Sequence, residues 1–110
     1  MIQETDSETL HQRLAAGERV RLVDIRSSGE VAQGIIPGSE HLPMHLIPLR
    51  LPDLPKDQEL VLYCRSGARS YHACMYLAQQ GYSRVVNLRG GIVAWARHGF
   101  EIAAPDAVAP

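Results

Sequence analysis

The chain has 110 residues, of which 45% are hydrophobic, and a formal net charge of -1 at pH 7. This length suits one domain with its own core, and the near-neutral charge excludes the strongly basic surface of nucleic-acid and anionic-membrane binders. The first ten residues, MIQETDSETL, are acidic and polar, unlike a signal peptide, and no apolar run approaches the roughly 20 residues needed to span a bilayer, so we expect a cytoplasmic protein.

The first half of the chain alternates short helical patterns with short apolar runs. Thr5–Glu8 matches a capping box, and leucines then recur at helical spacing until Gly17 supplies a stop. After this first helix the pattern predicts a strand over 21–25, a short helix over 28–33, a turn at 37–38 and another short helix over 44–51.

The second half repeats this alternation with stronger signals. An apolar tetrad predicts a buried strand over 60–63, followed by a helix over 69–80, a second buried strand over 85–88 and a last helix after Gly90–Gly91, with Trp95 as a core anchor. Strands that alternate with helices predict an α/β fold, with parallel strands and helices on both faces of the sheet. Functional sites in such sheets form at the carboxyl ends of strands, where Cys64 is expected.

The residues after Cys64 favour a reactive thiol. Ser66, Gly67 and Ala68 form a small-residue loop whose amides can point inward as an anion-binding nest, and a helix begins directly after it. Arg65 and Arg69 add positive charge. We therefore expect the pKa of Cys64 to lie below its usual value and the site to accept an anionic substrate.

Cys74 is expected to pack in the core, because it lies on an apolar helical stripe. Its spacing from Cys64 matches no zinc motif and does not suit a disulfide, and His72 is expected at the surface.

Four segments together resemble the single-domain rhodanese family: DIRSSGE (24–30), GIIPGSEHLP (34–43), YCRSGARS (63–70) and LRGGIVAWARHG (88–99). The resemblance implies a three-layer rhodanese-like fold, with a five-stranded, mostly parallel sheet and helices on both faces. We expect this rhodanese domain to span 1–102, and the Ala/Pro-rich residues 103–110 to form a flexible tail.

The resemblance also implies a sulfurtransferase. The Cys64 thiolate would take the outer sulfur of thiosulfate as a persulfide and pass it to cyanide or a thiol, without a metal or an organic cofactor. A sulfur-carrier protein is a further candidate partner. The predicted substrate-binding residues are those of the loop: Arg65, Ser66, Gly67, Ala68, Arg69 and Ser70, with helix capping as an equal role for Ser70.

Asp24 and Arg26 match the family's Asp-x-Arg pattern. They are expected to support the site, more as an ion pair or loop clamp than as part of the pocket rim. The chain departs from the usual family pattern at Val31, Ile35 and Glu101, none of which lies in the Cys64 loop.

Three alternatives stay open. A cysteine-dependent phosphatase or arsenate reductase uses a similar loop but needs five residues between its cysteine and arginine, whereas four separate Cys64 from Arg69. An inactive interaction module would lack the cysteine. A persulfide carrier that serves a partner protein would keep the same chemistry, and small size, an exposed pocket and the absence of a second domain over that pocket suit this role.

Overall fold

A computed structural model describes residues 2–105 and contains one parallel sheet of five strands. The strand order is β1-β5-β4-β2-β3, and all four neighbouring pairs are parallel. The strands are Gln3–Thr5 (β1), Arg21–Asp24 (β2), Glu40–His41 (β3), Leu60–Tyr63 (β4) and Val85–Leu88 (β5). The α/β fold and its five-stranded parallel sheet are therefore confirmed.

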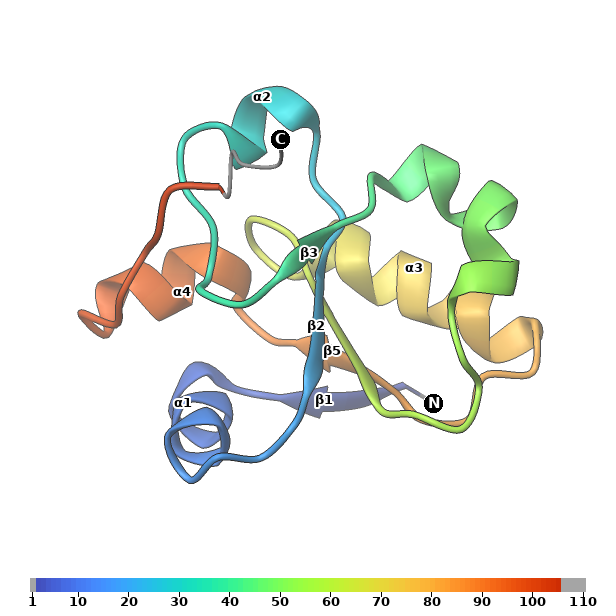
Figure 1. Cartoon of the computed structure of the whole chain (residues 1–110), viewed down its shortest axis with the longest axis horizontal. Helices are drawn as coiled ribbons and strands as arrows, with labels where there is room; N and C mark the ends of the chain where they lie inside the picture. Colours follow the sequence, from blue (N-terminus) through green and yellow to red (C-terminus); the bar gives the residue numbers. More distant parts are fainter. Residues whose placement is uncertain (1, 106–110) are drawn as a thin grey trace.

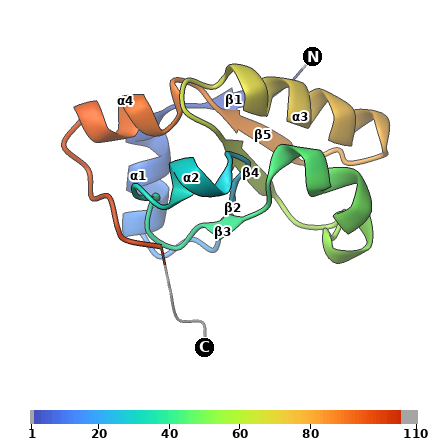
Figure 2. The same cartoon turned by 90° about the horizontal axis from the view of Figure 1, so that it is seen from above.

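Helices cover both faces of the sheet and complete the three layers (Figures 1 and 2). α1 (Ser7–Ala15) and α4 (Gly91–Arg97) lie on one face. α3 (Ala68–Gln79) and the 3-10 helix η1 (Met44–Asp53) lie on the other, and the short α2 (Ser28–Val31) follows the carboxyl end of β2. Each functional loop thus leaves the sheet at the carboxyl ends of the strands, where the helices follow.

The alternation of side chains along β4 explains why its sequence is an unbroken apolar run. Leu60 and Leu62 pack into the core beneath α3 and η1, whereas Val61 and Tyr63 pack into the core beneath α1 and α4. All four residues are at most 1% exposed. A central strand buried on both faces delivers Cys64 directly to the carboxyl edge of the sheet.

Several element boundaries differ from the sequence prediction for local reasons. Asp6, not Thr5, caps α1, because its side chain accepts a hydrogen bond from the Thr9 amide at 2.8 Å. A capping box does occur at α2, between Ser27 and Glu30. Residues 44–53 form a 3-10 helix, in which Pro48 and Pro52 remove the amides that an α-helix would need.

The C-terminal segment is tied to the domain at the first residue of the predicted tail. Ala103 exchanges two backbone hydrogen bonds with Ile35, of 2.8 and 2.9 Å, in an antiparallel bridge. The Trp95 indole, in the core as predicted, donates to the Glu101 carbonyl at 2.8 Å. The predicted flexible tail otherwise falls largely on 106–110, which lie outside the described residues.

The three departures from the family pattern lie away from the Cys64 loop. Val31 is buried at the end of α2, Ile35 forms the bridge to Ala103, and the Glu101 carbonyl receives the indole of Trp95. Across residues 2–105, no helix is both long and apolar enough to cross a membrane.

Candidate active site

Cys64 is the first residue after β4, and its sulfur lies inside the turn that leads into α3. The Gly67 amide donates a hydrogen bond to Sγ at 3.1 Å, and the Ser70 hydroxyl lies 3.5 Å from Sγ. The amides of Ser66 and Ser70 act on the sulfur in the same sense. The loop therefore encloses the sulfur with donors, as the sequence predicts.

The start of α4 holds the loop in this conformation. Its amides at Ile92 and Val93 donate to the carbonyls of Cys64 and Arg65, at 3.0 and 3.1 Å. With these carbonyls bound from outside, the loop amides are free to face the sulfur. Gly91 permits the close approach: it has φ +57°, and a Cβ built there would lie 2.4 Å from the Arg65 oxygen.

Opposing effects set the pKa of Cys64. Burial raises this pKa and is the largest single effect. Hydrogen bonds from the Ser70 hydroxyl and from the amides of Ser70, Gly67 and Ser66 together lower the pKa by more than burial raises it, so the net shift is downward. A thiolate is therefore favoured relative to an ordinary cysteine, as predicted.

The prediction of an exposed pocket is wrong for the sulfur itself, because Cys64 is buried. Cys64 is 1% exposed, whereas Arg65, Ser66, Ala68 and Arg69 are exposed around the mouth of the loop. The bonds from α4 to the loop carbonyls hold the loop against the domain. Beside the loop lies a surface cavity of about 400 Å³, lined by Ile25, Arg26, Ser27, Ser28, Pro43, Met44, His45 and Arg69.

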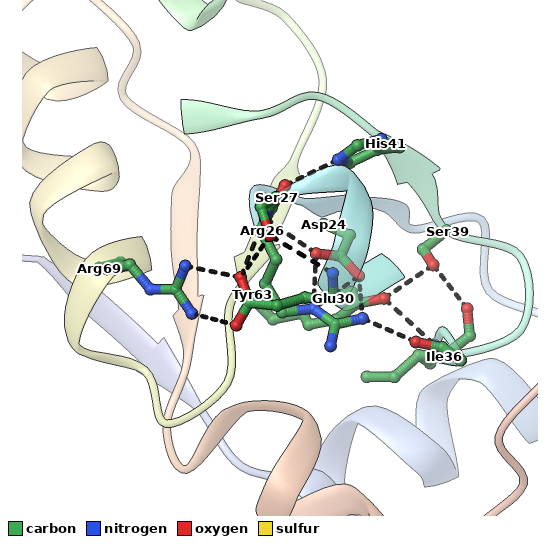
Figure 3. Close-up of polar contacts among 10 residues, drawn as sticks. Asp24, Arg26, Ser27, Glu30, Ile36, Ser39, His41, Tyr63 and Arg69 are labelled. Atoms are coloured by element: carbon green, nitrogen blue, oxygen red, sulfur yellow. Dashed lines mark hydrogen bonds and ion pairs between the residues drawn. The ribbon is translucent and has the colours of Figure 1, made fainter. Parts of the chain in front are cut away.

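Arg69, predicted to bind substrate, is paired with a carboxylate. Its guanidinium donates two hydrogen bonds to Glu30 of α2, of 2.9 and 2.8 Å (Figure 3). Arg69 lowers the pKa of Glu30 to about 2, so Glu30 is ionised at neutral pH. Part of the positive charge expected near the sulfur is thus neutralised, while Arg65 is exposed on the loop.

Asp24 and Arg26 form a buried clamp, which is the structural role that the sequence favoured (Figure 3). Arg26 donates from Nε and Nη2 to the Asp24 carboxylate, at 2.8 to 3.1 Å, and from Nη2 to the Gly34 carbonyl at 2.7 Å. The Tyr63 hydroxyl accepts from the Ile36 amide at 3.1 Å and lies 2.9 Å from the Ser39 hydroxyl. Together these contacts fix residues 26–39 against the sheet, although Arg26 also lines the cavity.

Cys74 is a core residue, as predicted. It is 0% exposed in the cluster between the sheet and α3, and burial raises its pKa to about 12. Both cysteines are free thiols, and His72 is exposed. Across residues 2–105, no group of three or more histidine, cysteine or acidic side chains is arranged to hold a metal ion.

Three residues of the site were missed at the sequence level. Asn87, a buried polar residue within β5, accepts a hydrogen bond from Ser70, Gly91 makes room for the loop, and Glu30 holds Arg69. A signal existed for Asn87, because an amide interrupts the otherwise apolar run VVNL. The pair Gly90–Gly91 indicated a turn but not its contact with a loop 26 positions earlier in the chain.

Comparison with known proteins places the chain in a family. Residues 6–98 match the family model described as rhodanese-like domain. A sulfurtransferase of Allochromatium vinosum is 65% identical over 106 residues, which cover 96% of this chain and 99% of that protein. The thiosulfate sulfurtransferase GlpE of Stutzerimonas stutzeri is 39% identical, with 72% of each chain covered. A rhodanese-like domain protein of Staphylococcus aureus superposes with a TM-score of 0.84 at 32% identity, covering 93% of this chain and 99% of its own.

Proposed function

The chain belongs to the rhodanese-like domain family and is a sulfurtransferase, and we propose that it moves the sulfane sulfur of thiosulfate to cyanide or a thiol through a persulfide on Cys64. The observation that carries this proposal is the inward-facing loop, in which Gly67 and Ser70 direct donors at Sγ while α4 holds the loop carbonyls from outside.

In the first half-reaction the Cys64 thiolate attacks the outer sulfur of thiosulfate. A new bond forms from Sγ to that sulfur, the sulfur–sulfur bond of thiosulfate breaks, and sulfite leaves with the bonding electron pair. Three negative charges enter the step and three leave it, two on sulfite and one on the persulfide. No general base is required, since the nucleophile is already a thiolate.

The loop stabilises the charge before and after this step. In the free enzyme the charge is on Sγ, where the Gly67 amide donates at 3.1 Å. In the persulfide it moves to the outer sulfur, toward the mouth of the loop, where the exposed Arg65 supplies positive charge. An acceptor then attacks the outer sulfur, and the thiolate of Cys64 is the leaving group.

Two further observations support sulfur transfer over phosphate chemistry. A phosphatase loop of this kind directs its arginine inward at a phosphoryl group, whereas Arg69 is bound by Glu30 outside the loop. The span from Cys64 to Arg69 is also one residue shorter than the cysteine-to-arginine span of the phosphatase loop. It therefore suits a single sulfur atom better than a tetrahedral oxyanion.

The acceptor is proposed to be a thiol, small or on a partner protein such as a sulfur carrier. Met44, 36% exposed, lines the cavity beside Arg69 and offers an apolar contact next to the mouth of the loop. A reducing cytoplasm suits this chemistry, because both cysteines are free.

The test is steady-state transfer from thiosulfate to cyanide by the wild type, Cys64→Ser and Cys74→Ser. We expect Cys64→Ser to be inactive and Cys74→Ser to keep most of its activity, because Cys74 lies in the core with its pKa near 12. Equal loss in both variants would replace this mechanism with a two-thiol one. Turnover of an aryl phosphate without sulfur transfer would favour the phosphatase alternative.

A further inference from the structure

A chain of polar contacts runs from the exposed Glu4 of β1 to the buried nucleophile. Glu4 of β1 contacts Asn87 of β5, Asn87 contacts Ser70 of α3, and Ser70 contacts Cys64. Asn87 is 1% exposed and Ser70 is 0% exposed, so water does not compete for the contacts of these two residues with each other and with Cys64. Burying such groups is costly unless each hydrogen bond is made, which fixes their orientation.

The orientation of the Asn87 amide follows from its neighbours. One end of the amide lies 2.8 Å from a carboxylate oxygen of Glu4 and 3.2 Å from the Gly67 carbonyl, and both of these atoms only accept hydrogen bonds. That end must therefore be Nδ2, which donates to both. The oxygen Oδ1 then faces the Ser70 hydroxyl at 2.5 Å.

Ser70 has one hydroxyl hydrogen and two neighbours that can accept it. Oδ1 of Asn87 carries no hydrogen, so at 2.5 Å the hydroxyl must donate to it. The same hydroxyl lies 3.5 Å from Cys64 Sγ. It cannot donate to both atoms at full strength at the same time.

We propose that Asn87 is a positioning residue that competes with the Cys64 sulfur for the single hydroxyl hydrogen of Ser70. When Cys64 is a neutral thiol, Ser70 donates to Asn87, and the thiol hydrogen can point at the Ser70 oxygen. When the thiol proton leaves to water, the hydroxyl turns to the charged sulfur and gives up its bond to Asn87. The amide therefore opposes formation of the free thiolate.

The competition also affects the persulfide of the proposed sulfur transfer, and this effect rests on that proposed function. In the persulfide the negative charge is on the outer sulfur, and Sγ is a weak acceptor. Asn87 then accepts the hydroxyl again, so Ser70 is never left as a buried donor without a partner. The amide thus stabilises the persulfide state relative to the free thiolate.

The test is the pH titration of Cys64 in the whole protein, followed by the ultraviolet absorbance of the thiolate without any sulfur donor. The first thiolate to appear as the pH rises belongs to Cys64, because burial raises the pKa of Cys74 to about 12. The readout needs no transfer activity. A failure of this proposal and a failure of the proposed function are therefore distinguishable.

Four proteins are compared: wild type, Asn87→Leu, Ser70→Ala and the double variant. We expect Asn87→Leu, which removes the competing acceptor, to lower the pKa of Cys64 by about one pH unit, and Ser70→Ala to raise it by about one. In the Ser70→Ala background, Asn87→Leu should no longer lower the pKa, because the only other contact it removes near the sulfur is the bond that supports the Gly67 carbonyl. The charged and titratable groups on the surrounding elements are the same in all four proteins, and they include Glu4, Asp24, Arg26, Glu30, His45, Tyr63, Arg65, Arg69, Tyr71, His72, Cys74 and Arg89.

Asn87→Val repeats the test with a smaller, β-branched residue that suits a strand, in case the leucine does not fit. Circular dichroism checks that each variant is folded. The proposal is overturned if either apolar variant leaves the pKa unchanged or raises it, if the same shift occurs without Ser70, or if Ser70→Ala alone leaves the pKa unchanged.

Discussion

Replacing Glu30 by glutamine should release Arg69 for the anionic donor and lower the KM for thiosulfate. Glu30 now holds Arg69 through two hydrogen bonds, of 2.9 and 2.8 Å, on the rim of the loop. Glutamine keeps the size of the side chain and its contact with the Ser27 amide, but removes the charge. The released guanidinium then adds a full positive charge at the mouth of the active site.

The size of the effect follows from the exposure of the pair. The side chains of Arg69 and Glu30 are 45% and 31% exposed, and exposed ion pairs contribute about 0.2 to 1 kcal/mol after solvent screening. The free energy gained in donor binding cannot exceed the free energy of the ion pair that holds Arg69 to Glu30. We therefore expect the KM to fall by up to about five-fold at low salt, since 1.4 kcal/mol corresponds to a factor of ten.

Glu30→Gln should also lower the free energy of unfolding, by a similar amount, because the ion pair with Arg69 is lost. The pKa of Glu30 in the folded protein is about 2, below the ordinary 4.5, so the pair stabilises the fold fully above pH 4.5 and less as the pH falls toward 2. The difference in free energy of unfolding between wild type and Glu30→Gln should shrink over that range.

Glu40→Gln is the matched control. It removes a similar two-bond pair with Arg21, of 2.6 and 2.9 Å, at the opposite end of β2 from the Asp24 clamp. It should lower stability by a comparable amount and leave the KM unchanged. If Glu30→Gln does not lower the KM, or if both variants change it equally, Arg69 has no role in donor binding.

Three further predictions concern the loop and its supports. Gly91→Ala should abolish most transfer activity, because the added Cβ would lie 2.4 Å from the Arg65 oxygen and displace the loop. Gly17→Ala is the control, since Gly17 also has a positive φ but no atom lies within 4 Å of its added Cβ; this variant should lower stability and leave the activity intact. Tyr63→Phe should lower the free energy of unfolding by about 1 to 3 kcal/mol, measured by urea denaturation, because the buried Ile36 amide loses its acceptor. Arg65→Ala should raise the KM for thiosulfate with little change in kcat, and an unchanged KM would remove its proposed role.

Much of the fold could be predicted from the sequence, because its strongest signals are local. The tetrad 60–63 is apolar at every position, as a strand buried on both faces must be, and it was predicted at its observed bounds. β5 was also predicted at its observed bounds. The edge strands β1 and β3 could not be found in this way, since they are short, mostly exposed and polar, and gain their structure only by pairing with β5 and β2.

The candidate site was predictable in its nucleophile and loop but not in its supports. The small residues between Cys64 and the next helix are enough to indicate a loop whose amides face inward. The partner of Arg69 was not predictable, because Glu30 lies 39 positions away and meets it only through the crossover of the fold. Asn87 was likewise unassigned, since its role depends on Ser70 and Glu4 from two other elements.

The most direct test of the central claim is the intact mass of the wild-type protein after exposure to thiosulfate and removal of the excess. The inward-facing loop predicts a gain of one sulfur atom, which cyanide removes and which is absent in Cys64→Ser. A protein that never gains sulfur, or a gain that persists in Cys64→Ser, would contradict a persulfide at Cys64.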